Sequence, residues 1–495
     1  MQVCSTVGRS ISLRALLPEA EFLGTDDIAV SSCACDSRQL KPGELFAALV
    51  GSRYDGHQFA AEAVARGASA ILSERPLAEL GVPNCVVPNA RDAMGRICQA
   101  LAGNPSYRLK LIGVTGTNGK TTTSCLIAGV LTTAGYRVGI LGTLGYCDGQ
   151  VVEPATHTTP PAGPLAGLLA RMAANQCSHA VMEVSSHALA QSRVAGLRFD
   201  AACVTNVSRD HLDYHPSLQD YRAVKSRLFD HLALEGFAVV NADDPVAAGY
   251  LCRLQSPALT VGIRSPAEIT ATPVEEFLSE QTFLLTAGSE TVPVRTRMIG
   301  RHHIYNCLTA AAVGLTYDID LLTIARGLES VGDVPGRLER IECGQPFAVF
   351  VDFAHTPDAL AGCLATLRNV SGGRLICVFG AGGDRDRQKR PLMGRAVERL
   401  SDLAVVTSDN PRNEDPQAIL AEILHGFHRP ASAQVLADRR EAIHWALAQA
   451  RPGDSVLIAG KGHENCQIVG NERLPLDDRE VARAWLYETQ PFAPR

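Results

Sequence analysis

The chain has 495 residues, enough for about three domains of ordinary size. Hydrophobic residues make up 46% of it and charged residues 20%, and no apolar run approaches the ~18 residues that a membrane span requires. Its net charge of -6 argues against general binding to nucleic acid or to an anionic membrane. We therefore expect a globular protein with neither a nucleic-acid nor a membrane partner.

The first residues lack a continuous apolar segment followed by a small-residue cleavage site, so no export is expected. The 15 cysteines are scattered singly, which is typical of thiols in a reducing compartment. Both observations indicate a cytoplasmic protein.

Short apolar runs flank one amphipathic segment in the first hundred residues. The runs Leu45–Val50 and Ala68–Leu72 predict strands, and His57–Arg66 between them predicts a helix. The sequence Gly-Asn-Pro-Ser at 103–106 has linker chemistry. We place the first domain boundary there and define the first domain as 1–106.

A glycine-rich turn follows the apolar run that begins at Leu111. It reads Thr-Gly-Thr-Asn-Gly-Lys-Thr-Thr over 115–122, which is typical of a loop that cradles phosphate at a helix N-terminus. Lys120 can reach the β- and γ-phosphates, and the Thr121 hydroxyl can bind Mg²⁺. Val114 stands where the general pattern has glycine, so an ordinary glycine-rich turn is the alternative.

The segments after this loop predict a mainly parallel sheet with helices on both faces. A helix over Thr122–Thr133 and a strand over Tyr136–Leu141 make the start of a β-α-β unit. The runs Ala180–Val184 and Ala201–Thr205 add two strands that end in polar residues. Ligands bind at such strand ends in parallel sheets.

Glu183 and His211 lie after these strands and are the leading candidates to complete a divalent-cation site. The alternative is that both are ordinary polar residues, with Asp210 and Asp213 as helix caps. Lys225 lies in an amphipathic helix, where periodicity alone indicates a structural or solvent-facing role.

The last third predicts a second α/β domain of Rossmann-like type. A polar, less regular stretch (254–294) and a helix through Gly314 come first, and Val-Pro-Gly-Arg at 334–337 marks the boundary between domains 107–334 and 335–495. The predicted strands of the last domain are Ala348–Val351, Leu375–Phe379, Leu403–Thr407 and Ser455–Ala459. Because a charged or glycine-rich loop follows each strand, we expect a site between this domain and the nucleotide domain.

These motifs together resemble the Mur ligase family, the ATP-dependent ligases that add amino acids to the peptide stem of peptidoglycan precursors. The resemblance rests on the loop at 115–122, Glu-Val-Ser-Ser-His at 183–187, Asn-Val-Ser-Arg-Asp-His-Leu-Asp at 206–213 and Val-Asp-Phe-Ala-His-Thr-Pro at 351–357. Asp-Ser-Arg at 36–38 and Asp-Asn-Pro-Arg at 409–412 narrow it to the branch that adds the third residue, meso-diaminopimelate.

The resemblance implies a set of ATP and metal contacts in the central domain. ATP should contact Gly116, Thr117, Asn118, Gly119, Lys120, Thr121, Thr122, Asn306, Arg337 and Asp352. Mg²⁺ should be held by Thr121, Glu183, His211 and Lys225, the last as a carbamate (N6-carboxylysine). The implied catalytic residues are Lys120, Glu183, His211 and Lys225. For Lys225 the resemblance therefore reverses the interpretation from periodicity.

It also implies where the substrates bind. The UDP end should contact Cys35, Ser37, Ser52, Arg53 and Tyr54, and the muramoyl-peptide part Thr158, Thr159, Ser185, Gln191 and Arg193. Diaminopimelate should contact Arg385, Asp409, Asn410, Pro411, Arg412, Gly460 and Glu464. A guanidinium suits the extra carboxylate of diaminopimelate and Glu464 suits an ammonium group. One position departs from the family pattern, because His303 stands where asparagine is frequent.

The implied reaction joins meso-diaminopimelate to the D-glutamate side chain of UDP-MurNAc-L-Ala-D-Glu through an acyl phosphate, with ATP consumed and Mg²⁺ as cofactor. A monomer whose last domain closes during turnover is expected. Two alternatives remain at this point: the same reaction with L-lysine, and a non-catalytic nucleotide-dependent binding protein.

Overall fold

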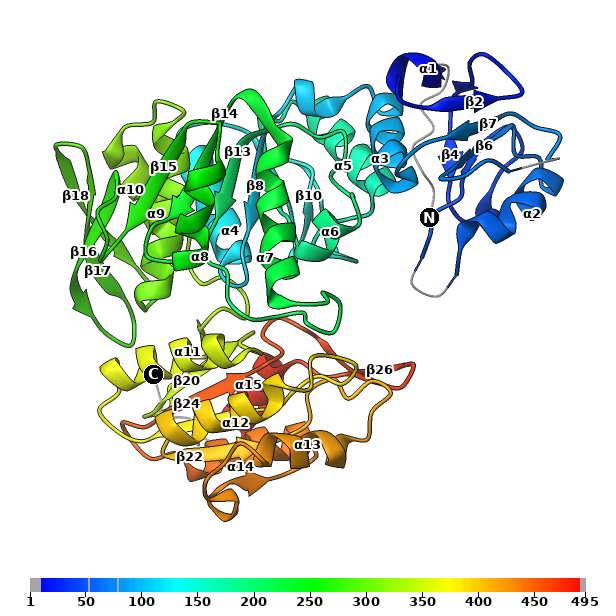
Figure 1. The fold of residues 1–495 in the computed structure, drawn as a ribbon. Helices are drawn as coiled ribbons and strands as arrows, with labels where there is room; N and C mark the ends of the chain where they lie inside the picture. The colour runs from blue at the N-terminus through cyan, green and yellow to red at the C-terminus, as the bar shows by residue number, and fades with distance from the viewer. Residues whose placement is uncertain (1–9, 52–53, 78–79, 490–495) are drawn as a thin grey trace.

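The computed structural model describes residues 10–51, 54–77 and 80–489. Its sheets fall into three successive parts of the chain, seen in Figure 1 as the blue part at the right, the cyan-to-green part beside it and the yellow-to-red part below. This arrangement confirms the predicted α/β class, with sheets of eleven, six and five strands and two two-stranded sheets in the described residues.

The first part is built on a five-stranded sheet in the order β2-β7-β6-β5-β4. Its elements are β1 (Ile11–Ser12), α1 (Leu13–Leu16), β2 (Glu21–Leu23), β3 (Ala29–Val30), β4 (Cys33–Ala34), β5 (Leu45–Ala47), α2 (Ala60–Ala65), β6 (Ala70–Ser73), β7 (Asn84–Val86) and α3 (Ala90–Leu101). The predicted helix at 57–66 begins as a 3₁₀ turn over Gly56–Phe59, so α2 is shorter than expected.

The central sheet has eleven strands in the order β11-β10-β9-β12-β8-β13-β14-β15-β16-β17-β18. Its strands are β8 (Lys110–Thr115), β9 (Val138–Gly142), β10 (Gly145–Cys147), β11 (Val152–Glu153), β12 (His179–Glu183), β13 (Phe199–Val204), β14 (Leu232–Asn241), β15 (Ala258–Gly262), β16 (Ile269–Glu276), β17 (Gln281–Ala287) and β18 (Glu290–Thr296). The pairs from β9 through β16 are parallel, which confirms a mainly parallel sheet.

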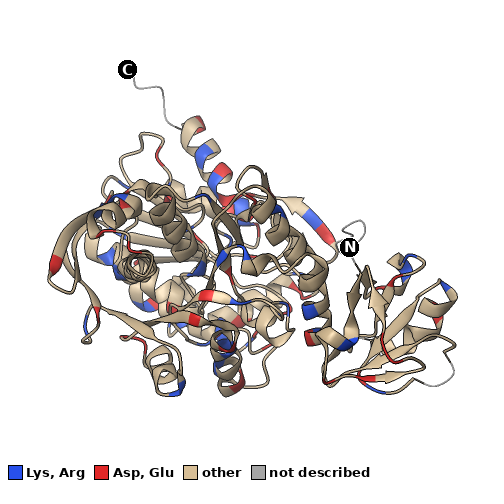
Figure 2. Cartoon of the chain, turned by 90° about the horizontal axis from the view of Figure 1, so that it is seen from above, with Lys and Arg blue, Asp and Glu red and all other residues tan. Residues whose placement is uncertain are grey.

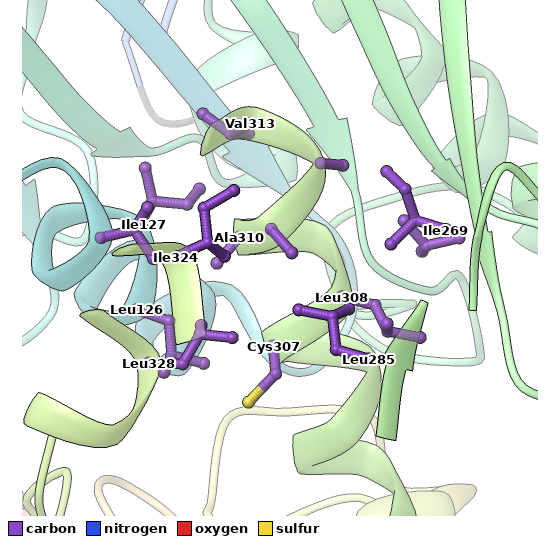
Figure 3. Close-up of a cluster of buried hydrophobic side chains, with 14 of the residues drawn as sticks. Leu126, Ile127, Ile269, Leu285, Cys307, Leu308, Ala310, Val313, Ile324 and Leu328 are labelled. Carbon is purple, nitrogen blue, oxygen red and sulfur yellow. The ribbon is translucent and has the colours of Figure 1, made fainter. Parts of the chain in front are cut away.

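Helices cover both faces of this sheet. They are α4 (Lys120–Thr133), α5 (Ala162–Ala174), α6 (Ser186–Ala190), α7 (Leu218–Ser226), α8 (Pro245–Tyr250), α9 (Arg301–Leu315) and α10 (Leu321–Ser330). Successive residues of β8 point to opposite faces, so Leu111 packs in the cluster with α5 and Ile112 in the cluster with α4, α9 and α10. Figure 3 shows the second cluster, where Leu126 and Ile127 of α4 meet Cys307 and Leu308 of α9 and Ile324 and Leu328 of α10. This packing fixes α4, whose N-terminus ends the glycine-rich loop.

The polar stretch at 254–294 is more regular than the sequence suggested. It forms β15 to β18, and β16–β17 and β17–β18 pair antiparallel. Phe283 and Leu285 are buried while Leu284 between them is exposed, the alternation of a sheet with one solvated face. Prolines at 273 and 293 weakened the sequence signal, because proline lacks the N–H of a strand ladder.

The last part carries a six-stranded sheet in the order β19-β20-β24-β21-β22-β23, parallel except at β19. Its elements are β19 (Glu339–Arg340), β20 (Ala348–Asp352), α11 (Pro357–Val370), β21 (Leu375–Phe379), α12 (Lys389–Leu400), β22 (Leu403–Val406), α13 (Pro416–Leu424), β23 (Gln434–Val435), α14 (Arg439–Gln449), β24 (Ser455–Ala459), the hairpin β25 (Cys466–Val469) and β26 (Glu472–Pro475), and α15 (Asp478–Thr489). The predicted Rossmann-like alternation is confirmed.

Positions of Lys and Arg and of Asp and Glu alternate along the cartoon in Figure 2, without a large region of one sign. In the described part of the chain, no helix is both long and apolar enough to cross a membrane.

A buried ion pair joins the first residues of α14 and α15 and holds the ends of β22 and β24. Arg439 donates to both carboxylate oxygens of Asp478, at 2.8 and 2.7 Å, and to the carbonyls of Ser408 and Ala459. Both partners are fully buried. This contact fixes the loops that begin after β22 and β24.

We predict that Arg439→Met destabilises this domain by about 3–5 kcal/mol, because Asp478 would be left buried without its partner. Urea unfolding followed by tryptophan fluorescence measures this, since both tryptophans of the chain, Trp445 and Trp485, pack in this domain. Arg483→Met is the control: Arg483 pairs with Glu339 and Glu480 at the surface, where an ion pair contributes about 0–1 kcal/mol. Equal unfolding midpoints for both variants would contradict the stabilising role that we give to the ion pair of Arg439 and Asp478.

Candidate active site

The glycine-rich loop is held in shape by the end of the neighbouring strand. The Thr117 and Asn118 N–H groups donate to the backbone and side-chain oxygens of Asn206, at 2.8 and 3.0 Å. A Cβ at Gly116 would lie 1.9 Å from Thr205 Oγ1, and Gly119 has a φ of +85° and would meet Asn306 Oδ1 at 2.5 Å. The loop geometry therefore requires glycine at both positions.

Two lysines converge on one carbonyl of this loop. Lys120 Nζ and Lys225 Nζ each donate to the Gly116 carbonyl at 2.8 Å. Lys225 is 1% exposed and its ammonium also lies over the Tyr221 ring. Burial, together with the charge of Lys120, lowers the pKa of Lys225 well below its usual value, and burial also lowers the pKa of Lys120. Lys225 is therefore a buried amine beside the phosphate loop, so of the two roles that periodicity indicated, structural or solvent-facing, the solvent-facing one is wrong.

Oxygen atoms gather beside the first turn of α4. Thr121 Oγ1 donates to Glu183 Oε2 at 3.0 Å, and Arg337 Nη2 donates to Thr121 Oγ1 at 3.0 Å. Glu183 also accepts from the N–H and hydroxyl of Thr143, at 2.7 and 3.1 Å. A carboxylate and a hydroxyl in contact next to a phosphate loop are the hard oxygen donors that Mg²⁺ prefers, so Thr121 and Glu183 fit this ion.

His211 occupies a strained backbone position, with a φ of +55°, on the loop after β13. Its ring lies 4.8 Å from that of His187. Burial lowers the pKa of His211 to about 3, although Asp210 opposes the shift. The imidazole is therefore neutral at physiological pH and has a lone pair to donate. Lys225 suits a cation only as the carbamate, because its ammonium form repels one.

A cavity of about 420 Å³ lies between the central and last parts of the chain. The predicted ATP, metal and diaminopimelate residues that line it are Thr117, Asn118, Gly119, Lys120, Thr121, Thr122, Glu183, His211, Lys225, Asn306, Arg337, Asp352, Arg385, Asp409, Asn410, Arg412, Gly460 and Glu464. Thr158 and Ser185 of the predicted muramoyl-peptide set also line it. Residues from positions 117 to 464 thus face one space.

The predicted muramoyl-peptide residues form a connected network beside Glu183. Thr159 Oγ1 donates to the Glu183 carbonyl at 2.8 Å, and the Ser185 N–H donates to Thr159 Oγ1 at 3.0 Å. Arg193 donates to the Thr159 carbonyl and to Gln191 Oε1, both at 2.8 Å. Thr158 joins this network through Thr143, whose Oγ1 lies 3.1 Å from Thr158 Oγ1.

The predicted diaminopimelate residues come from three loops of the last sheet. Arg412 has a φ of +51°, and its Nη1 donates to the Gly383 carbonyl at 2.8 Å. Asn410 Nδ2 donates to Glu464 Oε2 at 2.8 Å. Pro411 packs through its backbone against the loop that contains Gly383. Its carbonyl oxygen is so close that a Cβ on Gly383 would lie 1.8 Å from it. Arg385 projects from the loop between β21 and α12 and is 43% exposed at its side chain.

The described members of the predicted UDP set, Cys35, Ser37 and Tyr54, are not among the residues that line this cavity and lie in segments that follow strands β4 and β5 of the first sheet. Cys35 and Tyr54 are exposed and Ser37 is buried. Ser52 and Arg53 lie outside the described residues. The structure therefore brings together every predicted group except the UDP set.

Several residues of the cavity were not predicted. Asp210, His355 and Lys389 line it, and Asp210 lies 3.8 Å from His355 and 3.7 Å from Lys389. Beside the lining, Lys461 Nζ donates to Glu464 at 2.9 Å and to Asn410 Oδ1 at 3.1 Å. Lys461 belongs to the charged loop at 460–464, so a search of that loop for further cations could have found it, whereas Lys389 is the first residue of α12 and no sequence signal marked it.

Three stretches match known family models: Mur ligase family, catalytic domain (29–101), Mur ligase middle domain (114–314) and Mur ligase, glutamate ligase domain (336–462). A relative from Geobacillus thermodenitrificans is 45% identical over 460 residues, covering 92% of this chain and 94% of the relative. One from Gloeobacter violaceus is 46% identical over 470 residues, with the same coverage. Both are named UDP-N-acetylmuramoyl-L-alanyl-D-glutamate--2,6-diaminopimelate ligase.

The chain belongs to the Mur ligase family. A solved structure with the same ligase name is 33% identical, with a TM-score of 0.69 over 97% of this chain and 99% of that one. The predicted family and fold are therefore confirmed, and so is ATP-dependent amide-forming ligation as the class of activity.

In this Mur ligase, Gly119→Ala should weaken ATP binding about tenfold or more, because its Cβ would displace Asn306 from the loop. Isothermal titration calorimetry gives the affinity. Gly135→Ala is the control: its φ of +89° is equally unfavourable to alanine, but it lies at the far end of α4 with nothing within 4 Å. An unchanged ATP affinity in Gly119→Ala would refute the idea that the close approach of Asn306 to Gly119 shapes the ATP site.

Proposed function

We propose that this Mur ligase joins meso-2,6-diaminopimelate to the side-chain carboxylate of D-glutamate in UDP-MurNAc-L-Ala-D-Glu, with hydrolysis of ATP to ADP and phosphate. The observation that carries the proposal is the single cavity where the phosphate loop faces Arg385, Arg412 and Glu464. The names of the relatives support the same substrates.

Each domain has one task in this proposal. Domain 1–106 binds the UDP end, domain 107–334 binds ATP and domain 335–495 binds the amino acid. The enzyme works in the cytoplasm, where ATP and UDP-linked precursors are found, and acts as a monomer, because both catalytic domains that line the cavity belong to one chain.

In the first step, the acceptor carboxylate attacks the γ-phosphorus of ATP, the bond to the bridging oxygen breaks, and ADP leaves with the electron pair. Lys120 and Arg337 neutralise the phosphate charge, and the loop N–H groups orient the oxygens. Mg²⁺, bound by Thr121 and Glu183 with His211 and modified Lys225, would supply further positive charge.

In the second step, the neutral amine of diaminopimelate attacks the acyl carbon. The bond to the phosphate oxygen breaks, inorganic phosphate leaves with the electron pair, and the nitrogen gives up a proton to the released phosphate as the amide forms. Arg385 and Arg412 bind the distant carboxylate and Glu464 and Asp409 bind ammonium, which places the reacting amine at the cavity centre.

Carbamoylation of Lys225 follows from its surroundings. The neutral amine attacks CO₂ and loses a proton, which leaves a carbamate anion. Burial favours the neutral amine, because it lowers the pKa of Lys225. The product has carboxylate-like oxygens, and its negative charge offsets the neighbouring ammonium of Lys120.

Lys225→Ala should lower kcat about 100-fold, because one charged group at the phosphate site is lost. Addition of acetate should restore part of the activity in Lys225→Ala, since a free carboxylate can occupy the position of the carbamate. Lys120→Ala is the matched control, which acetate should not rescue, because it loses a cation. Steady-state ligation rates measured over a series of acetate concentrations test this. Full activity of Lys225→Ala without acetate would show that the carbamate has no part in the mechanism.

The wild-type enzyme should use meso-diaminopimelate at least about 100-fold more efficiently than L-lysine, because lysine leaves the guanidinium of Arg412 without a carboxylate. Arg412→Ala should raise KM for diaminopimelate about 10- to 100-fold while KM for ATP stays unchanged. Arg387→Ala is the control, since Arg387 is 62% exposed and pairs with Glu422 away from the cavity. A wild-type preference for lysine would overturn the proposed amine donor.

A further inference from the structure

A lysine of the last domain extends into the cavity and lies close to a carboxylate of the central domain. Lys389 is the first residue of α12, lines the cavity, and has a side chain only 6% exposed. Its Nζ lies 3.7 Å from Asp210 Oδ1 of the central domain. Because this separation exceeds hydrogen-bonding distance, the ion pair does not use the three N–H donors of the ammonium group.

Asp210 lies between the two domains and is 6% exposed at its side chain. It neighbours His211 at 3.4 Å on its own loop and His355 at 3.8 Å from the last domain. All three of these groups, the two imidazoles and the Lys389 ammonium, face the Asp210 carboxylate. Asp210 is thus a buried carboxylate of the central domain that attracts Lys389 of the last domain.

The neighbours of Asp210 place Lys389 on the phosphate side. The charge of Asp210 acts on both Lys120 and Lys225, the two lysines that donate to the Gly116 carbonyl of the phosphate loop. The amino-acid side already has two cations, Arg385 and Arg412. A further cation near Asp210 is therefore best placed to bind the phosphoryl group as it moves from ATP to the acceptor carboxylate.

We propose that Lys389 is a catalytic residue, whose ammonium group binds the phosphoryl oxygens as they pass from ATP to the acceptor carboxylate, and that Asp210 positions it. This inference rests on the proposed function. It gives the last domain a part in phosphoryl transfer, comparable to the arginine supplied to phosphate loops by a second domain. Closure of that domain would then complete the charge of the site.

Arg209 offers a matched control for the alternative that Lys389 only links the domains. Its Nη2 donates to Gln388 Oε1 at 2.6 Å and its Nε to Asp386 Oδ2 at 3.3 Å, so it joins the same loop to the segment just before Lys389. Arg209 is outside the residues that line the cavity. Arg209→Gln therefore removes a bridge between the domains without removing a charge from the cavity.

The experiment measures acyl-phosphate formation without an amine donor, by trapping with hydroxylamine, and then full turnover. Lys389→Met should lower both rates about 100-fold, while the ATP dissociation constant, measured by calorimetry, changes less than about threefold. Lys389→Arg should recover at least about tenfold of the loss, because it keeps the charge. Arg209→Gln should stay within about threefold of the wild-type rates.

Equal losses in Lys389→Met and Arg209→Gln would overturn the proposal in favour of a domain link. A rise in KM for the amine donor with normal acyl-phosphate formation would overturn it in favour of an amino-acid contact. Lys389→Gln, compared by thermal unfolding, replaces Lys389→Met if that variant does not fold. Wild-type enzyme that forms acyl phosphate but rejects diaminopimelate would refute the proposed amine donor and leave the assignment of Lys389 intact.

Discussion

The arrangement of the site depends on the Gly116 carbonyl, which accepts hydrogen bonds from the buried Lys225 and the half-buried Lys120. Two ammonium groups so close together in a protein interior repel each other, and their charged forms are also penalised by desolvation. The fold balances them with Glu183 and Asp210, and the phosphates of ATP would add the remaining negative charge. A site with this excess of buried positive charge is suited to collecting anions. It also gives a physical reason for modifying Lys225, because a carbamate converts one of two repelling cations into an anion.

This charge balance is completed by residues far apart in the sequence. Arg337, at the start of the last domain, donates to Thr121 in the first turn of α4. Asp210 of the central domain neighbours His355 and Lys389 of the last domain. Neither domain alone encloses the cavity, since its lining comes from both. The enclosure excludes water from an acyl phosphate, which water would otherwise hydrolyse. Chemistry is therefore coupled to the contact between the domains.

The sequence predicted local features well and long-range features poorly. The phosphate loop was recognisable because glycines, Lys120 and Thr121 act within one turn of chain. Lys225 was not, because the helical pattern of α7 does not reveal that Tyr221 and the loop bury that face. The resemblance to a family supplied its role, as it did for the substrate residues, which stay predictions. Lys389 was missed because its meaning depends on Asp210, a carboxylate 179 positions away that only the fold brings near. Lys461 was missed although its partner Glu464 is only three positions away, because the sequence does not show that its ammonium is buried. The antiparallel strands β16 to β18 were missed because their exposed face is polar.

Discrimination between amino acids rests on charge balance in the last domain. Glu464 Oε2 already accepts from Lys461 and Asn410, whereas Asp409 Oδ2 is buried and accepts no hydrogen bond from the described residues. The buried Lys461 thus offsets Glu464, and the unpartnered oxygen of Asp409 offers a site for an ammonium group. Arg412 is half-buried in a left-handed conformation that aims its guanidinium at the cavity. A substrate with an ammonium and a carboxylate at its distant end satisfies both groups, whereas one with only an ammonium leaves Arg412 desolvated and unpaired. Selectivity in such a site comes from the penalty on the wrong substrate at least as much as from the attraction of the right one.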